Sequence, residues 1–163
     1  MNFRAVVITV SDRGARGERE DGSGPELARL IQTIGMEVIG RQIIPDEKEL
    51  IRQALIRWSD GENADLILTT GGTGVSPRDV TPDATKEVIE REIPGMAEAM
   101  RHQSLLVTPH AMISRAMTGI RGRTLIINLP GSPKGARENL SVILPALVHA
   151  IEKIKGDQKE CAS

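Results

Sequence analysis

Short runs of aliphatic and β-branched residues recur along the chain, and segments with helical periodicity lie between them. The runs fall at residues 5–10, 38–44, 64–70 and 124–128. The first run has no polar alternation, which is typical of a strand buried on both faces of a parallel sheet. The second run mixes polar and apolar residues and indicates a strand near a sheet edge.

The intervening segments have apolar residues three or four positions apart, as amphipathic helices do. This spacing predicts helices over about 25–34, 46–58, 81–92, 96–106 and 140–154. Strands that alternate with helices predict an α/β fold, a three-layer sandwich with a mostly parallel central sheet flanked by helices.

Length and composition narrow the classes of protein that fit. The 163 residues suit one domain, which we place at residues 1–155, followed by a polar C-terminal tail at 156–163. A net charge of −1 and 1% aromatic residues argue against nucleic acid as a partner. No targeting signal and no membrane-length apolar stretch is visible, so we expect a cytoplasmic protein with no membrane association.

Three predicted strands run into polar or glycine-rich loops, at residues 11–24, 69–79 and 128–134. In open α/β sheets, ligands bind beyond the carboxyl ends of the strands. This coincidence is the main functional signal in the hydrophobic pattern.

The loop Thr70-Gly71-Gly72-Thr73-Gly74 has the composition of a phosphate cradle. Its glycines allow left-handed backbone angles, and successive amides can form an anion-binding nest. A tight turn without a ligand fits the same residues. The loop lacks the Lys-Ser/Thr pair of a P-loop and the third glycine of a dinucleotide fingerprint.

Two aspartates follow strand ends and have two readings each. Asp79 lies five residues after Gly74, and a carboxylate beside a phosphate site calls for a cation such as Mg²⁺. A turn or cap residue is the alternative. Asp46 precedes Glu49 by three residues, which predicts an acidic capping box, although a cap can also offer an oxygen to a metal.

The motifs occur together in an order that identifies a family. In sequence they are Ser11-Asp12-Arg13, Asp21-Gly22-Ser23-Gly24, Pro45-Asp46, Thr70–Gly74, Arg78–Pro82 and Leu129-Pro130-Gly131-Ser132-Pro133. The chain resembles the molybdopterin adenylyltransferase family of molybdenum cofactor biosynthesis, which includes the MogA/MoaB group and the G domain of gephyrin-like proteins. The likeness extends from about residue 6 to 151.

The resemblance implies a reaction and an assembly. Molybdopterin and ATP would react with Mg²⁺ to give adenylyl-molybdopterin and pyrophosphate. A homotrimer, with a hexamer as a further possibility, would hand the product to a molybdate-inserting protein.

The resemblance also implies roles for particular residues. Asp46 and Asp79 would be catalytic and would hold the metal. Phosphate and molybdopterin would be bound by Thr70, Gly71, Gly72, Thr73, Gly74, Ser11, Asp12, Ser104 and Ser114. The nucleotide would be bound by Asn128, Pro130, Gly131 and Ser132.

Three other functions remain open at this stage. A pterin-binding paralogue without adenylyltransferase activity would keep the fold and the loops. A trimerising interaction module would use the domain as a scaffold. A redox enzyme on a dinucleotide fold is disfavoured by the failed fingerprint.

Overall fold

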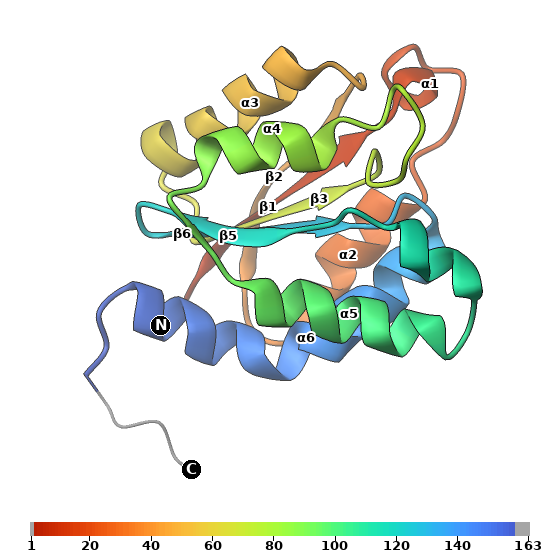
Figure 1. Cartoon of the computed structure of the whole chain (residues 1–163). Coiled ribbons are helices and arrows are strands. Elements are labelled where there is room, and N and C mark those ends of the chain that lie inside the picture. The colour runs from red at the N-terminus through yellow and green to blue at the C-terminus, as the bar shows by residue number, and fades with distance from the viewer. Residues whose placement is uncertain (1, 159–163) are drawn as a thin grey trace.

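The computed structural model describes residues 2–158 and contains one six-stranded sheet with the order β2-β1-β3-β6-β5-β4 (Figure 1). Four neighbouring strands are parallel. The last two pair antiparallel. The strands are β1 (Arg4–Val10), β2 (Glu37–Ile44), β3 (Leu66–Thr70), β4 (Arg91–Glu92), β5 (Thr118–Arg121) and β6 (Thr124–Leu129).

Helices cover both faces of the sheet, as Figure 1 shows, with α3 and α4 on one side and α2, α5 and α6 on the other. The α-helices are α1 (Asp12–Ala15), α2 (Ser23–Gln32), α3 (Lys48–Ile56), α4 (Thr81–Val88), α5 (Pro94–Leu105) and α6 (Pro133–Ile154). A π-helical turn, η1 (Arg57–Gly61), and a 3₁₀-helix, η2 (Pro109–Ile113), complete the chain. The predicted three-layer α/β fold is confirmed.

Successive side chains of the central strands point to opposite faces of the sheet and contribute to two separate cores. In β1, Ala5 and Val7 face the α2–α5–α6 layer. Val6 and Ile8 face the α3–α4 layer. Because successive strand side chains point to opposite faces, an apolar run without alternation supplies both cores at once.

The region between α4 and β6 differs from the prediction. The helix expected over 81–92 ends at Val88, and Arg91–Glu92 forms the edge strand β4. It pairs with β5, which the hydrophobic pattern did not reveal. A Cβ at Gly119 of β5 would lie 2.6 Å from Ile89 Cδ1 and 2.8 Å from the Arg91 carbonyl oxygen, so glycine permits this close pairing.

The boundary of α3 is also a correction. Asp46 does not cap this helix: its N-cap is Glu47, which makes no side-chain capping bond. The capping box predicted from Asp46 and Glu49 is therefore wrong. No helix among residues 2–158 is both long enough and apolar enough to cross a membrane.

Candidate active site

The glycine-rich loop after β3 is folded tightly against its neighbours. Gly71 and Gly72 have φ angles of +104° and +66°, which favour glycine. An added Cβ at Gly71 would lie 2.3 Å from the Val10 carbonyl oxygen. Thr81, at the start of α4, donates from Oγ1 to the Gly71 carbonyl (2.9 Å) and from its amide to the Gly72 carbonyl (3.1 Å). The backbone of the loop is therefore pinned at its base.

A polar cavity of about 380 Å³ opens on one side of this loop. It lies beyond the carboxyl ends of β1 and β3, at the edge of the sheet where ligands bind in open α/β folds. The first residues of α2 and the turn that begins α6 are part of its wall. Helix N-termini favour anions. The predicted site residues that line it are Ser11, Asp46, Thr70, Gly71, Gly72, Asp79, Gly131 and Ser132.

Asp46 is held in the polar cavity by a reciprocal pair of hydrogen bonds with Asp12. The Asp12 amide donates to Asp46 Oδ2 (2.9 Å), and the Asp46 amide donates to Asp12 Oδ1 (3.0 Å). Burial of the carboxyl, with added repulsion from Asp12 and Asp79, raises the pKa of Asp46. The Asp12 amide and the charge of Arg78 act in the opposite direction, but the pKa of Asp46 stays raised.

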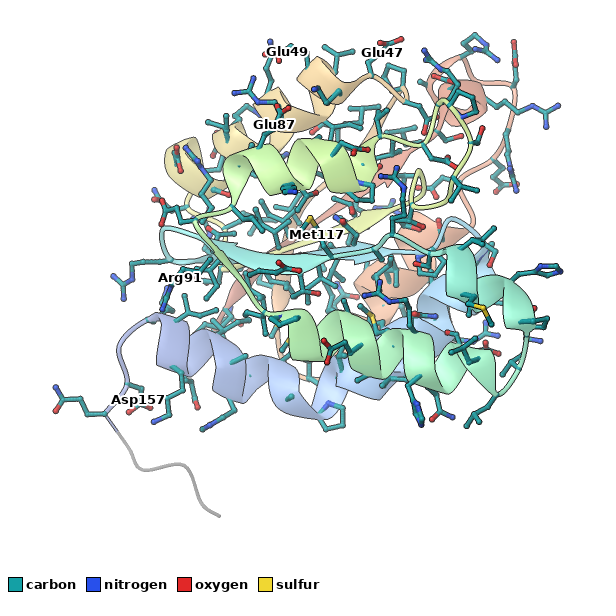
Figure 2. All side chains as sticks on the ribbon, in the orientation of Figure 1. Glu47, Glu49, Glu87, Arg91, Met117 and Asp157 are labelled. Carbon is teal, nitrogen blue, oxygen red and sulfur yellow. The ribbon has the colours of Figure 1, made fainter. Side chains whose placement is uncertain are left out.

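The Asp12 carboxylate is engaged by hydrogen bonds within the chain. Arg78 donates to both of its carboxylate oxygens and also to Glu47 Oε1. Figure 2 shows Glu47 at the end of the α3–α4 layer where α3 begins, and Arg91 at the opposite end. The hydrogen bonds from Arg78, with the amide of Asp46, lower the pKa of Asp12. Asp12 does not line either cavity, and its contact with the polar cavity is through its hydrogen bonds to Asp46.

Asp79 lies within the loop that joins the glycine-rich turn to α4. Its Oδ2 accepts from the Ser76 amide (3.0 Å), and its own amide donates to the Ser76 carbonyl (2.9 Å). The carboxylate therefore closes a turn and still lines the polar cavity. Both readings of Asp79, as a turn residue and as a cavity carboxylate, describe real contacts.

The donors in this cavity fit Mg²⁺ bound together with a substrate. Among residues 2–158, no three His, Cys, Asp or Glu side chains are grouped to hold a metal ion. Mg²⁺ commonly binds through one or two carboxylates plus phosphate oxygens and waters. Asp46 and Asp79 supply two carboxylates. Burial raises the pKa of Asp46 because it disfavours the charged form, and a bound cation would stabilise that form.

A second cavity, of about 280 Å³, lies on the other side of the glycine-rich loop, between α5, η2 and the start of α6. Its wall includes apolar side chains such as Val107 and Ile113, together with the Arg101 side chain. Ser132 lines both cavities. The predicted site residues found here are Thr73, Gly74, Ser104, Ser114, Pro130 and Ser132.

Asn128, like Asp12, is a predicted site residue that lines neither cavity. Its side chain is fully buried. Its Nδ2 donates to Thr69 Oγ1 and Thr85 Oγ1 (both 3.0 Å), and its Oδ1 accepts from the Met117 amide (3.2 Å). Its side chain thus joins β3 and α4 to Met117, the residue just before β5, and these bonds link the sheet to the α4 layer.

Asp21 and Arg101 are among the cavity side chains that residue-by-residue reasoning missed. Asp21 lines the polar cavity and accepts from Thr9 Oγ1 (2.8 Å) and the Gly24 amide (2.9 Å). Arg101 lines the second cavity and donates to the Ala116 carbonyl (2.7 Å). The Asp21-Gly22-Ser23-Gly24 motif was a usable signal for Asp21, whereas Arg101 has no local signature.

Comparison with known proteins places this site in a family. Residues 6–149 match the family described as "Probable molybdopterin binding domain", and the chain belongs to that family. This confirms the identification made from the ordered motifs.

Individual relatives agree with the family assignment. The chain is 41% identical to a molybdopterin adenylyltransferase of Helicobacter pylori over 93% of this chain and 87% of that protein. It is 46% identical to gephyrin of Dictyostelium discoideum over 94% of this chain but 23% of that protein. The crystal structure of the molybdopterin biosynthesis enzyme MoaB from Thermus thermophilus has 50% identity and a TM-score of 0.90, covering 95% and 98% of the two chains.

Proposed function

We propose that this chain is a molybdopterin adenylyltransferase of molybdenum cofactor biosynthesis. An oxygen nucleophile of molybdopterin attacks the α-phosphorus of ATP, and the new P–O bond forms as the bond to the pyrophosphate leaving group breaks. The observation that carries this proposal is the pair of cavities that adjoin across the loop of residues 71–74 and share Ser132. Two substrates bound there would bring their reacting groups together beside Ser132, which lines both cavities.

The two cavities suit different substrates. The polar cavity has Asp46 and Asp79 and lies at helix N-termini, which suits a triphosphate with its metal. The second cavity combines apolar walls with Ser104 and Ser114, which suits a ring system with polar edges. We assign ATP phosphates to the first and molybdopterin to the second.

The chain's own groups align the reactants and stabilise charge. Amides of the loop at residues 71–74 bind phosphate oxygens in the geometry fixed by Thr81. Asp46 and Asp79 would hold Mg²⁺, which neutralises phosphate charge when bound. Holding two substrates in reactive geometry supplies much of the rate of such a reaction, so no Cys or His nucleophile is required.

Direct turnover tests the proposal. Protein, molybdopterin, ATP and Mg²⁺ are mixed, and adenylyl-molybdopterin and pyrophosphate are quantified. We expect product from the wild type and none from Asp79→Asn, which keeps the fold. Glu87→Gln is the matched control, because Glu87 is a carboxylate on the outer surface of α4 paired with Lys48 and Arg52 (Figure 2). An active Asp79→Asn protein would remove the role assigned to Asp79.

A second candidate function is a pterin-binding protein without adenylyl transfer. The likeness to structures titled MoaB keeps this alternative in view. Saturable molybdopterin binding by the wild type without any product would favour it, whereas product formation at multiple turnovers would exclude it.

Assembly and setting extend the proposal. We propose that residues 1–155 act as one domain in a homotrimer, or a pair of trimers, in the cytoplasm, and that a molybdate-inserting protein takes the product. Exposed apolar side chains at Leu106, Val107 and Met112 support self-association, because large apolar patches mark contact surfaces. Light scattering at micromolar concentration gives the oligomeric mass, and a monomer would contradict the trimer.

A further inference from the structure

Arg115 lies in the segment between η2 and β5 and contacts the Asp79 loop at several points. None of these contacts has a function in the reaction proposed above. Its amide donates to the Thr73 carbonyl (2.8 Å). Its Nε donates to the Gly74 carbonyl (2.8 Å), and Nη2 donates to the Asp79 carbonyl (2.6 Å). The same guanidinium forms a two-pronged ion pair with Asp83 in the first turn of α4.

These contacts join both ends of the loop that carries Asp79. Thr73 and Gly74 lie at the start of this loop and Asp79 lies near its end. Asp83 lies just beyond it, in the first turn of α4. The residues between them, including Val75 (63% exposed), have little packing of their own. A planar guanidinium with fixed donor directions sets the distance between two carbonyls better than a flexible ammonium does.

Arg115 also connects the two cavities. The residues just before it, Ile113 and Ser114, line the second cavity. The loop it clamps puts Asp79 on the wall of the polar cavity and Gly74 on the wall of the second. A change in the position of the Arg115 side chain would therefore affect both substrate sites.

We infer that Arg115 is a positioning residue that fixes Asp79 relative to the glycine-rich loop and thereby sets the metal requirement of the reaction. This inference rests on the proposed adenylyl transfer. Arg115 lines neither cavity, so it acts through Asp79. A displacement of a reacting group by about 1 Å can lower a rate on the order of 100-fold.

The test compares Arg115→Ala with Arg121→Ala. Arg121 is a close match, because it also forms a two-pronged ion pair, with Asp60, and donates to a backbone carbonyl, that of Val88. It touches neither cavity. The readouts are kcat, the Mg²⁺ concentration for half-maximal rate, and the thermal unfolding midpoint.

We expect Arg115→Ala to lower kcat about 100-fold and to raise the half-saturating Mg²⁺ concentration about tenfold, whereas Arg121→Ala changes both less than threefold. Arg115→Lys keeps the charge but loses the fork. It folds and gives an intermediate kcat with a raised Mg²⁺ requirement, which covers the case in which the alanine variant fails to fold.

Two results would overturn the inference. The first is an Arg115→Lys or Arg115→Ala protein with wild-type kcat and wild-type Mg²⁺ dependence. The second is an equal loss in the Arg115 and Arg121 variants that follows their thermal midpoints, which would mean general stability alone. An inactive wild type is a different outcome, because it contradicts the adenylyl transfer itself.

Discussion

The two ends of the sheet hold aspartate side chains in different surroundings, with Asp65 buried at one end and Asp46 partly buried at the other. At the amino end of β3, Asp65 is 6% exposed, accepts from the Arg4 amide (2.8 Å) and is paired with Lys155. At the carboxyl end, Asp46 accepts an amide hydrogen bond from Asp12, and its charged neighbours are the carboxylates of Asp12 and Asp79 and the more weakly acting guanidinium of Arg78. The charge of Asp65 is paired directly within the chain, whereas the charge of Asp46 is only partly offset by Arg78 and its pKa stays raised.

The two aspartates are therefore expected to contribute differently, Asp65 to the stability of the fold and Asp46 to function. A paired buried carboxylate costs stability when its partner is removed, since an uncompensated charge or amide remains. A carboxylate whose pKa is raised by burial already reduces stability at neutral pH. The active end of this domain is therefore expected to be the end where removal of a charge costs turnover and not folding.

The largest expected effect is on turnover at the carboxyl end. Asp46→Asn should lower kcat about 1,000-fold, the scale of losing one electrostatic contact in a reaction site. Its stability at pH 7 should equal or exceed that of the wild type, because Asn Oδ1 can still accept from the Asp12 amide and the buried charge is gone. Turnover and urea unfolding measure the two quantities.

The adjoining residue provides the control for Asp46→Asn. Glu47 is exposed and pairs with Arg78 at the surface, so Glu47→Gln should leave turnover near the wild-type rate. An Asp46→Asn protein with turnover within tenfold of wild type would contradict the comparison between the two ends.

The next effect is on stability at the amino end. Asp65→Ala should lower the free energy of unfolding by about 3 kcal/mol, since it removes two hydrogen bonds that involve a charged group and leaves the Arg4 amide unpaired. Turnover per folded molecule should not change. Urea unfolding followed by Trp58 fluorescence measures the loss.

Asp60→Ala sharpens this second prediction. Asp60 forms an ion pair with Arg121 but its side chain is 52% exposed, so its removal should cost less than about 1 kcal/mol. Equal losses for Asp60→Ala and Asp65→Ala would show that burial is not what distinguishes the amino end.

The layers and the loops could be predicted because they depend on local sequence. Runs without polar alternation identified the buried parallel strands, and the glycines of residues 71–74 indicated a loop with left-handed backbone. The edge of the sheet could not be predicted in this way. β4 has two residues. β5 contains Gly119, and glycine is suited to this strand position because a larger residue would collide with Ile89.

Roles that depend on distant partners were also beyond the sequence. The local pattern made Asp46 a cap, but its partner is Asp12, 34 residues away. Asn128 stands at a strand end, as a ligand residue would, yet its amide is occupied by Thr69 and Thr85. Arg115 has no local motif. Only the fold brings these partners together.

A smaller effect is expected from the backbone of the glycine-rich loop. Gly72→Ala puts a Cβ 2.4 Å from Thr81 Oγ1 and 3.1 Å from Asp46 Oδ1, at a φ of +66°. It should cost about 1–3 kcal/mol of stability and lower kcat on the order of 100-fold by moving the cradle. Steady-state turnover and urea unfolding measure these effects.

Gly35→Ala isolates the backbone strain from the displacement of the site. Gly35 has a φ of +83° and open space where a Cβ would be, so only the strain of about 1–2 kcal/mol applies. Turnover should stay at the wild-type rate. If Gly35→Ala lost as much turnover as Gly72→Ala, the loop would owe its importance to stability alone.

The smallest effect is a difference in pH dependence between two aspartates of the active end. The pKa of Asp46 is raised above its ordinary value of 3.8, first by burial. As pH rises above 3.8, the unfolded chain loses this proton before the folded chain does. The wild type therefore loses stability relative to Asp46→Asn as pH rises through the folded pKa, and the two converge below 3.8.

Asp83 should show the opposite sign. The hydrogen bond from Arg115 lowers its pKa below 3.8, so its contribution to stability is fully present above pH 3.8 and is lost as pH falls through the folded pKa. Because the pair is about half exposed, the advantage of wild type over Asp83→Asn should stay below about 1 kcal/mol. Urea unfolding from pH 3 to 7 measures both differences. Slopes of the same sign would mean that the Asp46 charge is compensated within the chain, and the contrast between the ends of the sheet would then fail.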